Sequence, residues 1–252
     1  MKLEFLKKSG LFYFAAVLLL PYAAHATILG TVDMAYSSFG AYEYVLVTGG
    51  VASGTPAPAG VVRFKSTSAT GEGQIWNNQP ISGFCIELAE PRQNSSSTYD
   101  VLMPSDGPMT ASSLESSMGK GKAAYLSELW GRYYDPSWST GDTFTSTQNS
   151  QAAIFAAAVW EIVHEDFTGN PLDWDVSADG TPGNGGFATY AIDYTTANNW
   201  LHSLDGTGPM ANLRVLGSNG SQDFLVAVPE PATIAILGIG GMFSLIRRKK
   251  LA

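Results

Sequence analysis

The sequence has 252 residues, of which 45% are hydrophobic and 14% charged, and its formal net charge at pH 7 is −8. A chain of this length and hydrophobicity can bury a sizeable core in one domain. Its acidic balance argues against nucleic acid and anionic membranes as partners. Cys85 is the single cysteine, so the chain cannot form an internal disulfide.

The N-terminal segment has the three-part pattern of a secretory signal peptide. A basic start, Met1–Lys8, precedes an unbroken apolar run, Leu11–Leu20, and the small residues Ala24 and Ala26 then provide a cleavage site. The apolar run is too short to span a bilayer. We therefore predict a signal peptide over residues 1–26, recognised by an export translocase and cut by signal peptidase after Ala26.

The C-terminal segment carries a second signal. Pro229, Glu230 and Pro231 precede fifteen uncharged residues, 232–246, and the chain then becomes basic at Arg247, Arg248, Lys249 and Lys250. A helix of this length covers roughly 22 Å, which can span a bilayer if the basic side chains reach back to the headgroups. Because basic clusters stay in the cytoplasm, the body of the chain is expected outside.

The order of motif, apolar helix and basic cluster resembles the PEP-CTERM sorting signal. This resemblance implies that an exosortase-type membrane protease cuts the chain near Pro229–Pro231. It also implies a Gram-negative bacterium that makes exopolysaccharide or biofilm. We therefore expect export, transient anchoring in the inner membrane by the sorting tail, 229–252, and delivery to the cell surface, outer envelope or extracellular matrix. Extracellular polysaccharide or another surface is the expected partner there.

Removing both ends leaves one secreted domain, residues 27–228. It loses three lysines at the head and four cations at the tail, so seven of the 14 Lys and Arg remain. It also loses Glu4 and Glu230, so twenty of the 22 Asp and Glu remain. The domain therefore carries about −13, which fits a solvated extracellular protein.

Strand signals dominate the first half of the domain. Four short segments rich in β-branched and aromatic residues are predicted strands: 42–48, 61–65, 84–88 and 99–102. Gly49-Gly50 and Ala57-Pro58-Ala59-Gly60 have the composition of turns or loops. Near the C-terminus, the segments 213–216 and 224–228 flank Gly217-Ser218-Asn219-Gly220, which indicates a hairpin.

Helical periodicity follows in the middle of the chain. Apolar residues from Ala123 to Tyr133 recur at helical spacing, and this helix should end near Asp135-Pro136. A second helix, 149–164, is apolar on every face over Ala152–Trp160 and should be buried. A polar loop, 168–187, and a third helix, 189–204, follow. The fold class is α+β, with a barrel- or sandwich-like β framework around two or three helices.

Three segments in order carry a second resemblance: Phe84-Cys85-Ile86-Glu87, Ala123–Leu126 and Gln151–Ile162. Over about residues 80–200 they are similar to the Cys–Gln thioester domains of bacterial surface proteins. The resemblance implies that a strand cysteine condenses with a helix glutamine to give an electrophile that bonds covalently to a target. That bond requires the thiol and the carboxamide to meet in a dry pocket.

Two registers of the second helix are open. In the family the glutamine lies four residues before a tryptophan, and aligning on Trp160 places Ala156 at that position. The other register keeps Gln151 but replaces the tryptophan by Phe155. We favour the tryptophan register, in which Cys85 has no glutamine partner and is a buried structural cysteine.

Other patterns leave alternatives of different classes. The aromatic cluster of Trp130, Tyr133, Tyr134 and Trp138 could stack on sugars, although core packing is the preferred interpretation. The Glu161–His164 pair is interpreted as a solvated helix end rather than a metal or acid–base site. We predict a non-enzymatic adhesive or structural protein with no cofactor and no metal. The alternatives are a covalent adhesin using Cys85 and Gln151 and a secreted hydrolase acting on matrix polysaccharide, which needs two carboxylates facing one cleft.

Overall fold

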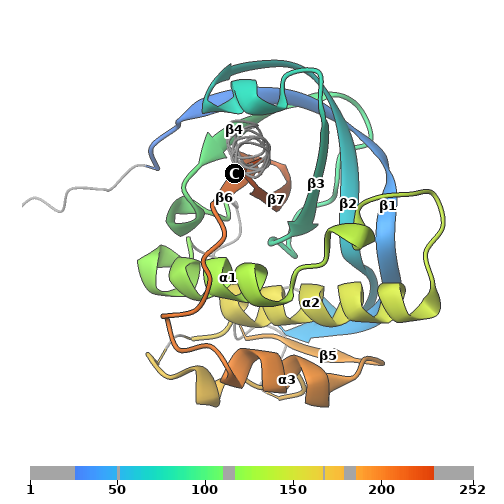
Figure 1. Cartoon of the computed structure of the whole chain (residues 1–252), viewed down its shortest axis with the longest axis vertical. Helices are drawn as coiled ribbons and strands as arrows, with labels where there is room; N and C mark the ends of the chain where they lie inside the picture. The colour runs from blue at the N-terminus through green and yellow to red at the C-terminus, as the bar shows by residue number, and fades with distance from the viewer. Residues whose placement is uncertain (1–25, 50–51, 110–116, 167, 179–185, 230–252) are drawn as a thin grey trace, which may run out of the picture.

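The computed structural model describes residues 26–49, 52–109, 117–166, 168–178 and 186–229. Within these residues the chain forms seven strands, three α-helices and four short 3₁₀ turns (Figure 1). The strands are β1 (Gly30–Gly49), β2 (Ala52–Gly71), β3 (Pro80–Cys85), β4 (Ser97–Leu102), β5 (Ala188–Tyr190), β6 (Leu213–Ser218) and β7 (Ser221–Ala227). The helices are α1 (Gly119–Tyr133), α2 (Ser146–His164) and α3 (Tyr194–His202).

Six of the strands form a closed antiparallel sheet. The order is β2-β3-β7-β6-β4-β1, and β1 pairs back to β2, so the sheet has the barrel-like form of the predicted α+β framework. Phe64, Tyr99 and Phe224 come from three different strands and meet inside it, with ring centroids 4.6 Å apart for Phe64–Phe224 and 6.2 Å for Tyr99–Phe224. Closure leaves few unpaired strand edges and buries these rings.

Strands β1 and β2 are far longer than predicted and continue past the closed sheet as a two-stranded ribbon. The predicted strands 42–48 and 61–65 lie within them, but the turn expected at residues 57–60 is wrong, because this segment lies inside β2. Pro58 pairs with Tyr44 on a stretch of β2 that has β1 as its only described partner. A proline is tolerated there because the missing N–H falls on a free edge.

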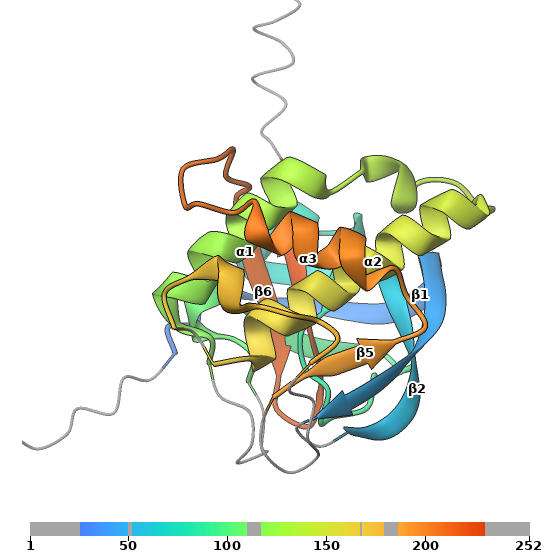
Figure 2. The ribbon, with the colours of Figure 1, turned by 90° about the horizontal axis from the view of Figure 1, so that it is seen from below.

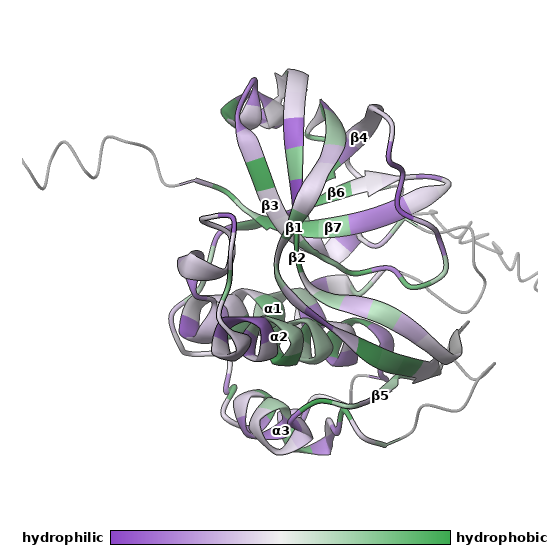
Figure 3. Cartoon of the chain, turned by 90° about the vertical axis from the view of Figure 1, so that its right-hand side faces the viewer, coloured by the Kyte–Doolittle hydropathy of each residue, from purple (hydrophilic) through white to green (hydrophobic). Residues whose placement is uncertain are grey.

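Helix α2 is buried between the closed sheet and the outer elements. Thr145 and Gln148 form a capping box, which starts the helix three residues before the predicted position. Every residue from Ala152 to Val163 is buried, as the all-round apolar pattern predicted. Figure 3 shows α1 and α2 beneath the strands, with α3 and β5 on their far side.

The third predicted helix is shorter than expected and begins later. Thr189 belongs to strand β5, where its side chain donates to the carbonyl of Leu46 at 3.0 Å. Asp193 caps α3 by accepting from the backbone N–H of Thr196 at 3.1 Å. The cap fixes where the helix begins. In Figure 2, α3 lies beside α2 and β5 runs below both.

The C-terminal hairpin is confirmed and the strand around Cys85 is corrected. Strands β6 and β7 pair, and residues 219–220 connect them. The predicted strand 84–88 ends at Cys85, because the carboxylate of Glu87 turns the chain by accepting the backbone N–H groups of Ala89 and Glu90.

Buried carboxylates hold several loops in the same way. Glu128 on α1 is fully buried and accepts the backbone N–H groups of Gly206 at 2.7 Å and Gly208 at 3.1 Å, together with the Arg132 guanidinium. Asp223 on β7 accepts from Ser218 at 2.8 Å and from the backbone of Met109. These bonds compensate the cost of burying each charge.

One hydrogen bond ties α2 to the closed sheet. The indole Nε1–H of Trp160 donates to the backbone carbonyl of Cys85 at 2.9 Å, and both residues are buried. The ring of Phe155 contacts Phe84, the residue before Cys85, at a centroid distance of 4.8 Å. The end of β3 and the middle of α2 are therefore fixed against each other by one polar and one apolar contact.

We predict that Trp160→Phe lowers the free energy of unfolding by about 1–3 kcal/mol more than Trp138→Phe does. The first change leaves a buried carbonyl without its donor. Trp138 is equally buried, but its Nε1 has no hydrogen-bond partner among the described residues, so it controls for lost packing. Urea titration of the processed protein measures both. Equal losses would contradict a structural role for the Trp160 bond.

Candidate functional site

Cys85 lies at the end of β3 in a closed environment. Its side chain is buried, and its thiol donates to the carbonyl of Glu87 at 2.8 Å. The backbone carbonyl of the same residue accepts from Trp160. Cys85 is therefore bonded within the core, as the structural interpretation predicted.

Ala156 lies on the same side of α2 as Trp160, the residue that bonds to Cys85. Residues four apart lie on the same face of a helix, so Ala156 stands one turn before Trp160 on the face that contacts β3. Its exposed fraction is 1%. In the tryptophan register this alanine stands at the position where the resemblance expects a carboxamide, so that register offers Cys85 no glutamine.

Gln151 lies away from Cys85. It is exposed in the second turn of α2 and precedes Trp160 by nine residues, roughly 13 Å along the helix axis. It lines a surface groove with residues of α3 and β1. The structure therefore does not bring Gln151 and Cys85 together.

The end of α2 differs from the solvated helix end that was predicted. Glu161 is 1% exposed and accepts the backbone N–H of Asp175 at 2.7 Å. Asp175 belongs to the segment that follows the 3₁₀ turn Pro171–Asp173, and this segment packs across the helix. His164 is partly exposed, but its Nε2 atom is buried. Burial, aided by the charge of Lys122, lowers the pKa of His164 to about 3. Across the described ranges, no three His, Cys, Asp or Glu side chains are grouped so that they could hold a metal ion.

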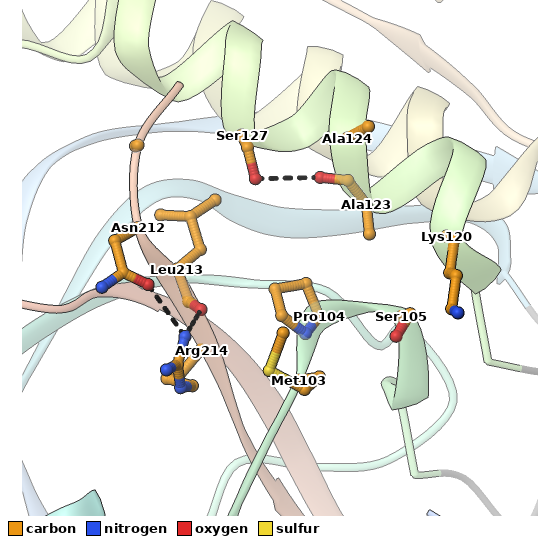
Figure 4. A pocket seen from close by; sticks show the side chains of 11 residues that line it. Met103, Pro104, Ser105, Lys120, Ala123, Ala124, Ser127, Asn212, Leu213 and Arg214 are labelled. Atoms are coloured by element: carbon orange, nitrogen blue, oxygen red, sulfur yellow. Dashed lines mark hydrogen bonds between the residues drawn. The ribbon is translucent and has the colours of Figure 1, made fainter. Parts of the chain in front are cut away.

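A first pocket, of about 340 Å³, lies between α1 and the start of β6. Figure 4 shows its mostly apolar wall, with Lys120 at one end and Arg214 at the other. Arg214 is held by Glu72 at 2.7 Å and by Asn212 at 2.9 Å. The carbonyl of Asn212 also accepts the backbone N–H of Val228, so the chain leaves the fold beside this pocket.

A second site, an open surface groove that we call the α2–α3 groove, has about 450 Å³ and a mixed lining of polar and apolar groups. Glu43 of β1, Gln151 of α2, and Asp193 and Trp200 of α3 contribute to it. The carboxylate of Asp193 is engaged in capping, with its second oxygen accepting from the Thr196 hydroxyl at 2.6 Å. These bonds lower the pKa of Asp193. A glycosidase acid needs a raised pKa, so Asp193 is poorly suited to that role.

The predicted aromatic cluster packs in the core. Trp130 and Trp138 are buried, at 5% and 2% exposure, and both contact the ring of Phe155. Tyr133 and Tyr134 are half-buried against it. The preferred interpretation of this cluster is confirmed.

Sequence reasoning missed a different set of aromatic residues, on β1. Tyr36, Phe39, Tyr42 and Tyr44 are in consecutive ring contact at centroid distances of 5.6, 4.5 and 5.8 Å. The Arg92 guanidinium lies over the first two rings, at 3.7 and 4.9 Å. We call these four rings the aromatic strip. The alternation at residues 42 and 44 was visible in the sequence, but the register shift between Phe39 and Tyr42 that joins both pairs was not.

The exposed end of the strip continues onto β5. Tyr44 is 65% exposed and Leu46 is 41% exposed, and Leu46 pairs with Tyr190, which is 51% exposed. A contiguous exposed apolar patch of this kind commonly marks an interaction site.

Comparison with known proteins identifies the tail. Residues 227–250 match the PEP-CTERM protein-sorting motif. The chain therefore carries the signal of an exported protein that exosortase sorts and that is transiently anchored in the membrane. No curated protein and no solved structure shows significant similarity to the chain.

The sorting signals themselves fall largely beyond the described residues. Ala24, Glu230, Pro231, the apolar segment 232–246 and the basic residues 247–250 lie outside them, whereas Ala26 and Pro229 are described and exposed. None of the helices in the described part of the chain is long and apolar enough to cross a membrane.

We predict that stability falls as the pH drops from 6.5 to about 5, and that His164→Gln flattens this slope. The folded state keeps His164 neutral because its pKa is about 3, whereas the unfolded chain takes up a proton near the ordinary value of 6.5. The unfolded state then binds more protons, which costs up to about 1.4 kcal/mol per pH unit. Urea titrations across this range measure the slope.

The comparison variant is His202→Gln, at a histidine of α3 that is largely exposed although its Nε2 atom bonds to the backbone carbonyl of Trp174 at 2.8 Å. An unchanged slope in His164→Gln would contradict the burial of a neutral imidazole at the end of α2.

Proposed function

We propose that this protein is an exosortase-processed component of the cell envelope or extracellular matrix whose domain acts non-covalently, in adhesion or in the structure of that layer. The sorting motif at residues 227–250 supports the export and processing. The observation that supports the non-covalent role is that Gln151 is exposed on α2 whereas Cys85 is buried in the core.

The surface of the domain supports an adhesive role. Tyr44 at the end of the aromatic strip, together with Leu46 and Tyr190, provides exposed apolar area on paired strands. Rigid aromatic side chains give contact area at a low cost in conformational entropy. Such a surface suits weak, repeated contacts with a matrix.

The non-enzymatic interpretation has its support in the α2–α3 groove. Glu43 and Asp193 both line it, which is the one arrangement here that favours the hydrolase alternative. Asp193, however, is bonded to Thr196 through both oxygens and holds the start of α3. Its lowered pKa keeps it ionised at neutral pH, so it is not available as a general acid.

Deleting residues 229–252 should abolish sorting. The truncated protein should be released after export without anchoring, because it lacks the motif and the apolar segment. Cell fractionation and immunoblotting of the full-length and truncated proteins, in a host that contains exosortase, measure this. A control that replaces only Pro229 and Pro231 by alanine should accumulate as an uncut, membrane-associated precursor. Unchanged maturation and unchanged location of both variants would contradict the sorting proposal.

The intact mass of the processed protein should equal that of its unmodified sequence. A Cys85–Gln151 thioester would instead lower the mass by one ammonia, and methylamine would reverse the deficit. The Cys85 thiol should react with a thiol reagent only after unfolding, since it is buried. Cys85→Ala is the control for both measurements. A deficit of one ammonia that disappears in this variant would establish the covalent adhesin instead.

A further inference from the structure

The α2–α3 groove contains polar side chains that the fold itself does not use. Glu43, Ser150 and Gln151 have no hydrogen-bond or ion-pair partner among the described residues, although all three line the same cavity. They come from two elements, β1 and α2, which the bond from the Tyr42 backbone to Asn149 Oδ1 holds together at 3.2 Å. The groove therefore presents these donors and acceptors on backbone elements that are held together.

The opposite wall of the groove is rigid. Trp200 stacks on Tyr133 with a centroid distance of 4.8 Å and an interplanar angle of 12°. The Tyr133 hydroxyl is within 2.6 Å of the Ser203 hydroxyl, which fixes the pair of rings. Asp193 and Thr196, bonded to each other, complete this wall. A ligand would meet an indole that is already positioned, at little cost in entropy.

The chemistry of the lining selects the ligand. The side chains that line the groove include two carboxylates and no lysine, arginine or histidine, so an anionic ligand would be repelled. A carboxylate accepts from a hydroxyl, a carboxamide both donates and accepts, and an indole packs against an apolar ring face. A sugar ring presents hydroxyls at its edge and C–H groups on its face, and a cavity of about 450 Å³ is in the range of small-ligand sites.

We propose that the α2–α3 groove binds a neutral glycan, with Glu43 and Gln151 bonding sugar hydroxyls and Trp200 packing against a ring. A polyamine is less well matched, because only Glu43 offers a carboxylate that is not already engaged. This inference rests on the proposed non-covalent adhesive role and supplies the class of ligand and the site.

The test measures binding of a panel of oligosaccharides to the mature protein, obtained by processing of the full-length chain. The probes are neutral hexasaccharides of glucose, mannose and galactose in several linkages, a hexasaccharide of uronic acid, and spermidine. Isothermal titration calorimetry should detect binding of at least one neutral probe and none of the uronate or spermidine. Glu43→Gln and Gln151→Ala should each raise its Kd at least tenfold.

Matched controls are Asp166→Asn and Gln74→Ala, which make the same chemical changes at exposed residues away from the groove. They should leave the Kd within twofold of the wild-type value. Unfolding midpoints of all four variants should agree, which separates binding from folding. No binding of any neutral probe, binding of spermidine or uronate alone, or binding that Glu43→Gln and Gln151→Ala leave unchanged would overturn the inference.

Failure of this inference and failure of the proposed function are distinguishable. A processed protein of unmodified mass that binds no neutral probe would remove only the groove assignment. A mass deficit of one ammonia would remove the non-covalent role, whatever the groove binds.

Discussion

Helix α2 has no face toward solvent after its second turn, and the rest of the fold is arranged around that constraint. The closed sheet, α1 and α3 each cover one side of it. Five alanines between Ala152 and Ala158 keep the helix thin, which allows the surrounding elements to approach closely. The Trp160–Cys85 bond then sets the helix at one position along β3. The resulting placement leaves Gln151 at the surface and Cys85 in the core, and so separates the two residues that covalent chemistry would need.

Buried carboxylates hold loops in place in this domain, a role that disulfides have in many exported domains. Glu87, Glu128 and Asp223 are fully buried, and each binds backbone N–H groups of a loop. Such a contact holds a loop through charge-assisted hydrogen bonds rather than a covalent link. The domain can therefore be rigid in an oxidising compartment with a single, buried thiol.

The sequence predicted the parts of this structure that depend on local pattern. The periodicity of α1 and α2 and the turn residues of the β6–β7 hairpin are short-range signals, and these elements are present. The length of β1 and β2 depends on pairing between distant segments. Pro58 and Gly60 have the composition of a turn, yet both pair with the partner strand, Pro58 with Tyr44 and Gly60 with Tyr42. Thr189 likewise joins a strand because Leu46 offers an edge.

The candidate sites also separate into those that depend on a local sequence pattern and those that depend on contacts between distant segments. The sorting tail is a linear motif and was readable in the sequence. The separation of Cys85 from Gln151 depends on how α2 packs on β3, which involves a bond between Trp160 and Cys85, 75 residues apart in sequence. The α2–α3 groove joins β1, α2 and α3, so no single segment indicates it. The sequence shows the individual aromatic and polar residues of the groove, but it does not show which of them lie next to one another in the fold.

The junction between fold and tail has a mechanical consequence. The backbone of Val228 is still bonded to Asn212, and the apolar segment begins at residue 232. The three residues between them reach at most about 11 Å. Before cleavage the domain would hang from the membrane on a tether shorter than its own radius, with little freedom to reorient. Proteolysis would thus change how the domain can move, as well as where it resides, and would permit its surfaces to sample directions that the precursor cannot face.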